Sequence, residues 1–258
     1  MQKFIEVKRG DLLIRGVIHV PENIDDNIPV VIMAHGFTGT NTEFGFSFVE
    51  LSRKLEKEGI ASVRFDFIGS GISDGEFIDM TLTSEIEDLK SIINYIKTLE
   101  YINKDKIALL GMSQGGVVSG MVAAIKREDI KALCLWSPAA CITDNLKDGH
   151  IQGVSIDEKA KMDGYVDVKG FKVGMNYIED ALRYDFYEIS KDFDKNVLLV
   201  YGSEDFIVPE KYIKGYLDYY KDRAEIVKVE GANHCYEKVE QKDELIESTI
   251  NFLMKELK

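Results

Sequence analysis

Short apolar runs that alternate with helical patterns are the feature that most constrains how this chain can fold. The runs are VVIMA (30–34), IASVRFDF (60–67), IALLG (107–111), IKALCLW (130–136), NVLLVYG (196–202) and EIVKVEG (225–231). Helical patterns lie at 46–58, 84–99 and 114–126, from about 209, and from about 240. Compact apolar runs separated by helices are typical of parallel strands buried on both faces. The sequence therefore predicts an α/β fold, with a mostly parallel central sheet and helices on both faces.

Two segments depart from this alternation. FIEVKR and LLIRGVIHV meet at Gly10-Asp11 and predict an antiparallel hairpin at the start of the chain. Residues 139–186 separate two predicted strands by far more than a usual loop and contain five glycines. We expect one domain over 1–258 in which 139–186 form an inserted lid over a substrate pocket. A decorative or oligomerising subdomain is the alternative interpretation of this insertion.

Charge and composition exclude several classes of partner. The chain has 32 Lys+Arg against 45 Asp+Glu, a net charge of −13, which disfavours nucleic acid and anionic lipid as partners. No apolar stretch reaches the length of a membrane span, and the first residues show no signal-peptide core. Three irregularly spaced cysteines give no disulfide framework. We therefore expect a cytoplasmic protein that does not bind a membrane.

A serine stands at a predicted junction between a strand and a helix. The segment Gly111–Gly115 reads G-M-S-Q-G and places Ser113 between the strand ending near 111 and the helix from 114. Glycines two residues before and after a serine permit the sharp turn of a nucleophile elbow. The turn lifts the hydroxyl above the sheet and places it at a helix N-terminus, which favours negative charge. A glycine-rich connector without chemistry is the alternative.

A serine nucleophile needs a base, and the chain has only four histidines. His19 lies in the hairpin and His150 in the insertion, while His35 precedes Gly36 and suits a backbone-positioning role. His234 follows the last predicted strand and should face the same sheet edge as the serine. We therefore assign His234 as the base, with a solvated loop histidine as the alternative.

The base needs a carboxylate that fixes its tautomer. Asp205 follows the strand at 196–202 and precedes His234, which gives the chain order serine, aspartate, histidine. Glu204 is the adjacent competitor for this role. Asp66 also follows a strand, but the D-x-x-G-x-G turn around it indicates a structural role.

The oxyanion formed by attack on a carbonyl needs two N–H donors. One is the backbone N–H of Gln114, the residue after the nucleophile. The other should come from the loop after an early strand, which here is HGFTG at 35–39, so we assign the N–H of Phe37. A tight turn with no catalytic role is the alternative for this loop.

With these motifs in order, the chain resembles the serine hydrolases of the α/β-hydrolase superfamily along its whole length. The motifs are HGFTG, FDFIGSGISDG, GMSQGG, GSED and GANH. It further resembles the bacterial cinnamoyl or feruloyl esterases, which carry an insertion after a strand ending in S/A-P-A-A. Ser137–Ala140 and the segment at 149–154 match these markers. Met112 is a departure, because such esterases often have histidine before the nucleophile.

The resemblance implies a serine carboxylesterase with the α/β-hydrolase fold that acts on esters of hydroxycinnamic acids. It implies that Asp144, Gln152 and Tyr177 of the lid bind the aromatic acyl part, with a solvated lid surface as the alternative. It implies no metal or organic cofactor, and relatives that are often dimers suggest a homodimer. Acyl-peptide or thioester hydrolysis, and ligand binding without turnover, remain the alternatives to ester hydrolysis.

Overall fold

The computed structural model describes residues 1–22 and 27–258, and their centre is an eight-stranded sheet in the order β1-β2-β4-β3-β5-β6-β11-β12. The strands are β1 (Gln2–Arg9), β2 (Leu12–His19), β3 (Ile28–Ala34), β4 (Ala61–Phe65), β5 (Ile102–Met112), β6 (Ala132–Trp136), β11 (Val197–Gly202) and β12 (Ala224–Val229). β1 and β2 form the predicted antiparallel hairpin, and β2 pairs antiparallel with β4. β4, β3, β5, β6, β11 and β12 pair with one another in parallel, in that order. The predicted α/β fold is confirmed.

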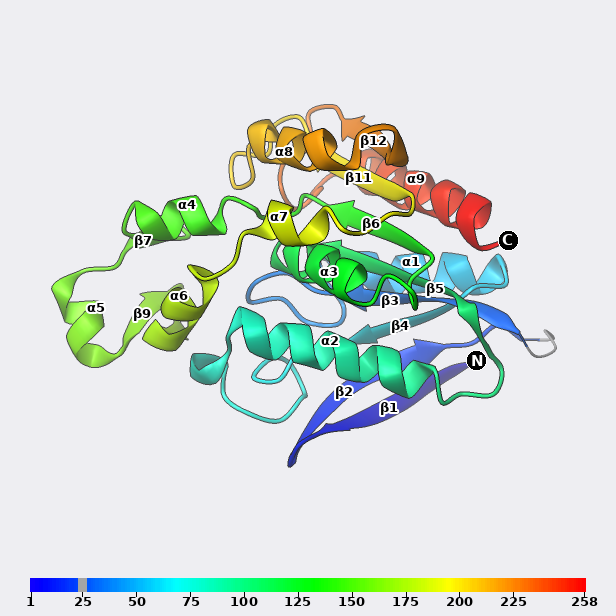
Figure 1. Cartoon of the computed structure of the whole chain (residues 1–258), viewed down its shortest axis with the longest axis horizontal. Helices are drawn as coiled ribbons and strands as arrows, with labels where there is room; N and C mark the ends of the chain where they lie inside the picture. The colour runs from blue at the N-terminus through cyan, green and yellow to red at the C-terminus, as the bar shows by residue number, and fades with distance from the viewer. Residues whose placement is uncertain (23–26) are drawn as a thin grey trace.

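Helices cover both faces of the sheet (Figure 1). They are α1 (Ser47–Lys57), α2 (Leu82–Ile96), α3 (Gln114–Ile125), α7 (Phe186–Ser190), α8 (Glu210–Tyr220) and α9 (Val239–Leu257). Short 3-10 turns lie at η1 (Phe44–Phe46), η2 (Phe77–Asp79) and η3 (Lys221–Arg223). Apolar residues of α1 and α9 pack in one core, and those of α2, α3 and α8 pack in the other. Because β3, β5 and β11 alternate between the two cores, both faces of these strands are buried and their carboxyl ends are held rigidly at one edge.

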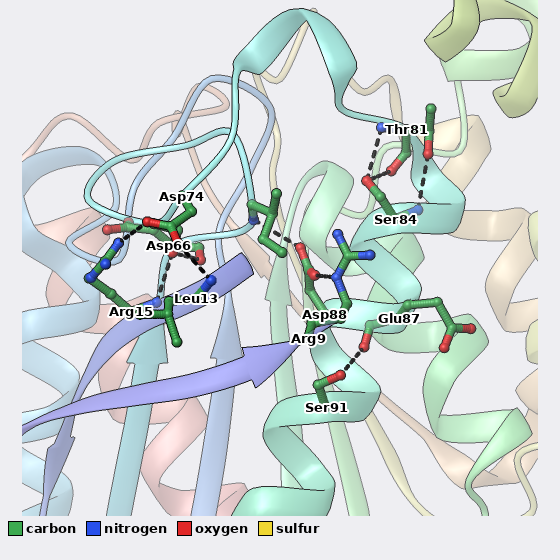
Figure 2. Close-up of polar contacts among 12 residues, drawn as sticks. Arg9, Leu13, Arg15, Asp66, Asp74, Thr81, Ser84, Glu87, Asp88 and Ser91 are labelled. Atoms are coloured by element: carbon green, nitrogen blue, oxygen red, sulfur yellow. Dashed lines mark hydrogen bonds and ion pairs between the residues drawn. The ribbon is translucent and has the colours of Figure 1, made fainter. Parts of the chain in front are cut away.

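The helix predicted from 84 begins earlier than expected. Thr81 is its N-cap, and its hydroxyl accepts the Ser84 N–H at 3.0 Å while the Ser84 hydroxyl accepts the Thr81 N–H at 3.1 Å (Figure 2). Glu87, which stands three residues after Ser84, takes no part in this capping box. Glu87 instead pairs with Lys90 on the exposed face. A hydroxyl can reach back to the cap N–H as a carboxylate does, so the box closes with two short side chains.

Carboxylates hold the loop that follows β4 against the hairpin (Figure 2). Asp74 accepts the Leu13 N–H at 2.9 Å and pairs with Arg15 at 2.6 Å. Asp88 of α2 accepts the Ile68 N–H at 2.9 Å and also pairs with Arg9. Burial raises the pKa of Asp88 to about 6. The loop that follows β4 is thus tied to both the hairpin and α2.

The segment 139–186 extends beyond the sheet on the side opposite the two termini (Figure 1). It contains α4 (Ile142–Lys147), β7 (His150–Ile151), β8 (Val154–Ser155), α5 (Glu158–Asp163), β9 (Tyr165–Val168), β10 (Phe171–Gly174) and α6 (Met175–Ala181). α6 is fastened to the start of α2, where Asp180 accepts the Thr83 N–H at 2.8 Å and the Thr83 hydroxyl at 2.6 Å. Within residues 1–22 and 27–258, no helix has the length and apolar character needed to cross a bilayer.

Candidate active site

Ser113 lies at a strained turn between β5 and α3. Its backbone has φ 55° and ψ −116°, a left-handed φ that a non-glycine residue adopts only when its surroundings impose it. The surroundings leave little room, because a Cβ on Gly115 would lie 2.2 Å from the Ala34 carbonyl oxygen. A Cβ on Gly111 would lie 2.0 Å from the Gly115 oxygen. The two glycines therefore serve the close approach that the G-x-S-x-G spacing predicts.

Three side chains from separate loops meet at the carboxyl edge of the sheet. His234 Nε2 lies 3.0 Å from Ser113 Oγ, and His234 Nδ1 lies 2.7 Å from Asp205 Oδ2. The other Asp205 oxygen, Oδ1, accepts the N–H groups of Ile207 at 3.0 Å and Val208 at 2.8 Å. Since a carboxylate only accepts, Nδ1 carries the imidazole proton and Nε2 is free to accept the serine hydroxyl proton.

The two other acids considered as partners of the base, Glu204 and Asp66, form no hydrogen bond with His234 in the part of the chain that the structure describes. Glu204 is exposed, whereas Asp205 is buried. Asp66 accepts the Asn41 N–H at 2.5 Å and the Ile72 N–H at 3.0 Å, so it organises its own turn as expected.

The HGFTG loop presents one face to Ser113. His35 Nε2 accepts the Phe67 N–H at 3.1 Å, so His35 Nδ1 donates to the Gly36 carbonyl at 2.8 Å. Glu43 accepts the Gly36 N–H at 2.8 Å. These contacts fix the peptide before Phe37 and confirm the backbone-positioning role of His35. Across the described residues, neither the Phe37 N–H nor the Gln114 N–H is engaged in a hydrogen bond.

Two cavities open on Ser113. The larger is about 570 Å³ and lies under the insertion, and the smaller is about 410 Å³ and lies beside His234. Both are also lined by Phe37, Gln152, Lys169 and Ile207. Apolar walls of the larger cavity come from Ala139, Ile142, Leu146, Ile151 and Tyr177. Met112 lines the smaller cavity directly beside the serine.

The three residues assigned to the lid pocket have different surroundings. Gln152 lines both cavities. Tyr177 lines the larger one, but its hydroxyl donates to Gln114 Oε1 at 2.7 Å, so the ring rather than the hydroxyl is left for a ligand. Asp144 lies outside both cavities and accepts the Tyr212 hydroxyl at 2.9 Å.

The structure thus places Asp144 behind Tyr212 rather than in the lining of the larger cavity, and its assignment to the substrate pocket stays a prediction. The helical turn of α4 explains the difference, because side chains three or four positions apart share a face and adjacent ones do not. Ile142, Asn145 and Leu146 line the larger cavity, whereas Thr143, Asp144 and Lys147 lie on the other face and line a separate cleft of about 380 Å³.

One buried acid at the site escaped the sequence analysis. Glu85 of α2 is only 3% exposed, and both of its carboxyl oxygens accept from Gln114 Nε2 at 2.9 Å. Burial, partly opposed by the bonds from Gln114, raises its pKa to about 8. An available signal was the position of Glu85 and Asp88, which both fall in the apolar stripe of an amphipathic helix.

Cys141 is a further potentially reactive side chain near the nucleophile. Cys141 lines the larger cavity, but burial raises the pKa of its thiol to about 11, which keeps it protonated at neutral pH. No group of three or more His, Cys, Asp or Glu side chains that could hold a metal ion occurs in the described ranges 1–22 and 27–258.

Comparison with known proteins shows which family this chain matches. Residues 10–168 match the family described as X-Pro dipeptidyl-peptidase (S15 family). An uncharacterised 31.7 kDa protein of Escherichia coli is 32% identical over 112 residues, which are 43% of this chain and 37% of that protein. This chain thus spans little more than a third of the length of that relative. A putative esterase/lipase 2 of Mycoplasma pneumoniae is 25% identical over 79% of this chain and 81% of its own length.

Solved structures agree with the fold over nearly the whole chain. Est1E from Butyrivibrio proteoclasticus with ferulic acid bound has a TM-score of 0.89 and 28% identity, and the match covers 98% of each chain. A further structure of Est1E has a TM-score of 0.84 and 26% identity, again over 98% of each chain. Together with the matched family, this likeness shows that the chain belongs to the X-Pro dipeptidyl-peptidase (S15) family, has the α/β-hydrolase fold and resembles the feruloyl esterases.

Proposed function

We propose that this protein is a carboxylesterase that works through a Ser113–His234–Asp205 triad. The observation that carries the proposal is the unbroken contact from hydroxyl to imidazole to carboxylate, at 3.0 and 2.7 Å. These distances lie within the reach that proton transfer from a serine nucleophile requires.

The reaction follows from where each atom lies. Ser113 Oγ attacks the ester carbonyl carbon while its proton passes to His234 Nε2. Asp205 holds the Nδ1–H and stabilises the imidazolium that forms. The imidazolium then protonates the alkoxide as the C–O bond breaks, which releases the alcohol and leaves an acyl-enzyme. Water repeats the sequence with His234 as base, and the acid leaves with Ser113 restored.

Two backbone N–H groups stabilise the oxyanion in this proposal. The Phe37 and Gln114 amides flank Ser113, and the α3 N-terminus adds its dipole at the same point. Support comes from the HGFTG loop, whose preceding peptide is held by His35 and Glu43. Donors fixed in this way need little reorganisation when charge develops, which is the condition for a large rate effect.

We propose esters of hydroxycinnamic acids as substrates. The larger cavity is walled by aliphatic side chains and by the rings of Tyr177 and Phe37, whose centroids lie 5.8 Å apart. Apolar and aromatic walls with a few polar groups suit a substituted aromatic ring. The ferulic acid bound to Est1E, a structure with TM-score 0.89, supports the same acid class. The insertion serves as the lid of this cavity.

Cleavage of peptides after an X-Pro dipeptide, or of acyl-peptides, is the second candidate. The family description favours it, because the matched residues 10–168 include the nucleophile loop. Acylation of serine by an amide uses the same groups as acylation by an ester, so the triad alone does not separate the two activities.

One set of assays tests these proposals. Methyl ferulate, short p-nitrophenyl alkanoates and an X-Pro p-nitroanilide are compared by kcat/KM, with Ser113→Ala as the control. Preference for the ferulate supports the aromatic pocket, whereas equal or better turnover of the alkanoates rejects it. Preference for the anilide transfers the proposal to peptide cleavage. Retained turnover in Ser113→Ala rejects the nucleophile, and failure of a fluorophosphonate to label Ser113 would indicate ligand binding without catalysis.

A further inference from the structure

A buried chain of hydrogen bonds runs behind the nucleophile and involves none of the triad. Tyr177 donates to Gln114 Oε1 at 2.7 Å, and Gln114 Nε2 donates to both oxygens of Glu85 at 2.9 Å. All three side chains are at most 3% exposed. The chain joins α6 of the insertion, the first residue of α3 and the first turn of α2.

Both polar atoms of the Gln114 amide have a buried partner. Its oxygen accepts from the Tyr177 hydroxyl, and its nitrogen donates to the Glu85 carboxyl, so the side chain is held from two sides. Without Glu85, Gln114 Nε2 keeps only one acceptor among the described residues, the weakly accepting Met80 Sδ at 3.7 Å. A buried N–H left without a good acceptor is unfavourable enough to make the side chain rotate away.

The same residue supplies an N–H to the reaction proposed above. Gln114 directly follows Ser113, and its backbone N–H is one of the two oxyanion donors, so this step depends on the proposed function. Side chain and backbone belong to one residue at the start of a helix, where a small rotation redirects the N–H. Oxyanion donors act only when they are held close to the required position.

We propose that Glu85 is a positioning residue that, through the Gln114 side chain, holds the Gln114 backbone N–H in place as the oxyanion donor. Tyr177 fixes the other end of the same amide. Through Tyr177 the arrangement also links the wall of the larger cavity to the nucleophile loop. A role of this kind acts on the rate of acylation and leaves the binding surface of the substrate unchanged.

The test compares two replacements of Glu85. Glu85→Met keeps the volume but removes the acceptor, so kcat should fall at least tenfold with KM within threefold. Glu85→Gln keeps an oxygen that can accept from Gln114 Nε2, so kcat should stay within threefold of wild type. Thr83→Val, which loses side-chain bonds to α6 in the same helical turn, is the matched control and should keep kcat within threefold. Unchanged kcat in Glu85→Met, or an equal loss in all three variants, overturns the proposal.

A double-mutant cycle with Gln114→Met shows whether Glu85 acts through that side chain. Gln114→Met keeps the backbone N–H but removes the side-chain amide that holds it in place, so this variant should lower kcat by itself. In its background Glu85→Met should lower kcat by less than a further threefold. A full tenfold further loss means that Glu85 acts by another route and overturns the proposal. Should Glu85→Met fail to fold, wild-type kcat in Gln114→Met alone overturns it.

The two proposals fail in different ways. Whether the wild-type protein hydrolyses esters at all tests the proposed function. The ratio of the kcat of a Glu85 variant to the kcat of the wild type tests the positioning role. The rate of Ser113 labelling by a fluorophosphonate gives the same ratio if no ester is turned over, because phosphonylation also places an oxygen near the Gln114 N–H.

Discussion

Replacing Glu85 by glutamine should change how stability depends on pH. The carboxyl group is buried, which raises its pKa to about 8 even though it accepts two bonds from Gln114. In the unfolded chain a glutamic acid has a pKa of about 4.3. Between these two values the folded protein holds one more proton than the unfolded protein does.

The sign of the effect follows from this proton. The contribution of Glu85 to stability is complete below about pH 4 and is lost as the pH rises toward about 8, because ionising the buried group opposes folding. Asp88 acts in the same direction but has a pKa of about 6, so most of its effect lies below that pH. Between pH 6 and 8, Glu85 alone should remove roughly 2 kcal/mol, from about 1.4 kcal/mol per pH unit with the slope halved near pH 8.

Urea unfolding of the wild type and of Glu85→Gln at pH 6 and pH 8 measures this loss. The wild type should lose roughly 2 kcal/mol more than the variant over that range, because glutamine does not titrate. Glu87→Gln, on the exposed face of the same helix, should behave as the wild type does. Equal losses in the wild type and Glu85→Gln would refute the conclusion that the buried group keeps its proton near neutral pH.

Three further predictions concern the site. Asp205→Asn should lower kcat at least about a hundredfold, whereas the adjacent exposed Glu204→Gln should keep it within twofold; steady-state kinetics distinguish the two residues. Gly115→Ala should lower the unfolding free energy by about 2–3 kcal/mol in urea titrations, because its Cβ would lie 2.2 Å from a backbone oxygen of β3. Asp144→Asn should change kcat/KM for methyl ferulate less than twofold, since this residue lies outside both cavities, and a larger change would restore it to the pocket.

Local pattern predicted much of the fold and the meeting of the three side chains. Ser113 and Asp205 follow buried parallel strands, His234 follows the largely exposed parallel edge strand β12, and the carboxyl ends of parallel strands share one edge of the sheet. The contact among these three side chains therefore follows from the order of the strands. The short apolar runs in the sequence are enough to predict those strands. The elbow glycines were equally visible, because a close approach of backbones leaves a fixed spacing in the sequence.

Other features depend on contacts that no local pattern contains. Asp144 was placed by alignment of an insertion whose helices are short, and one position along α4 decides which cleft a side chain lines. Glu85 contacts Gln114 across 29 residues of sequence, and only its place in an apolar stripe marks it. The capping box of α2 is another such feature, because Thr81 and Ser84 close it with two hydroxyls and only side-chain geometry shows this.

The arrangement of two cavities around one hydroxyl has a kinetic consequence for the proposed reaction. We expect the acyl half of an ester in the larger cavity and the alcohol half in the smaller one, so the alcohol can diffuse out while the acid is still attached to Ser113. The emptied smaller cavity then admits a water molecule beside His234 Nε2, the atom that accepts the proton of that water. Bulky alcohols that linger there should slow the second half of the cycle, and small nucleophilic alcohols should compete with water for the attached acid.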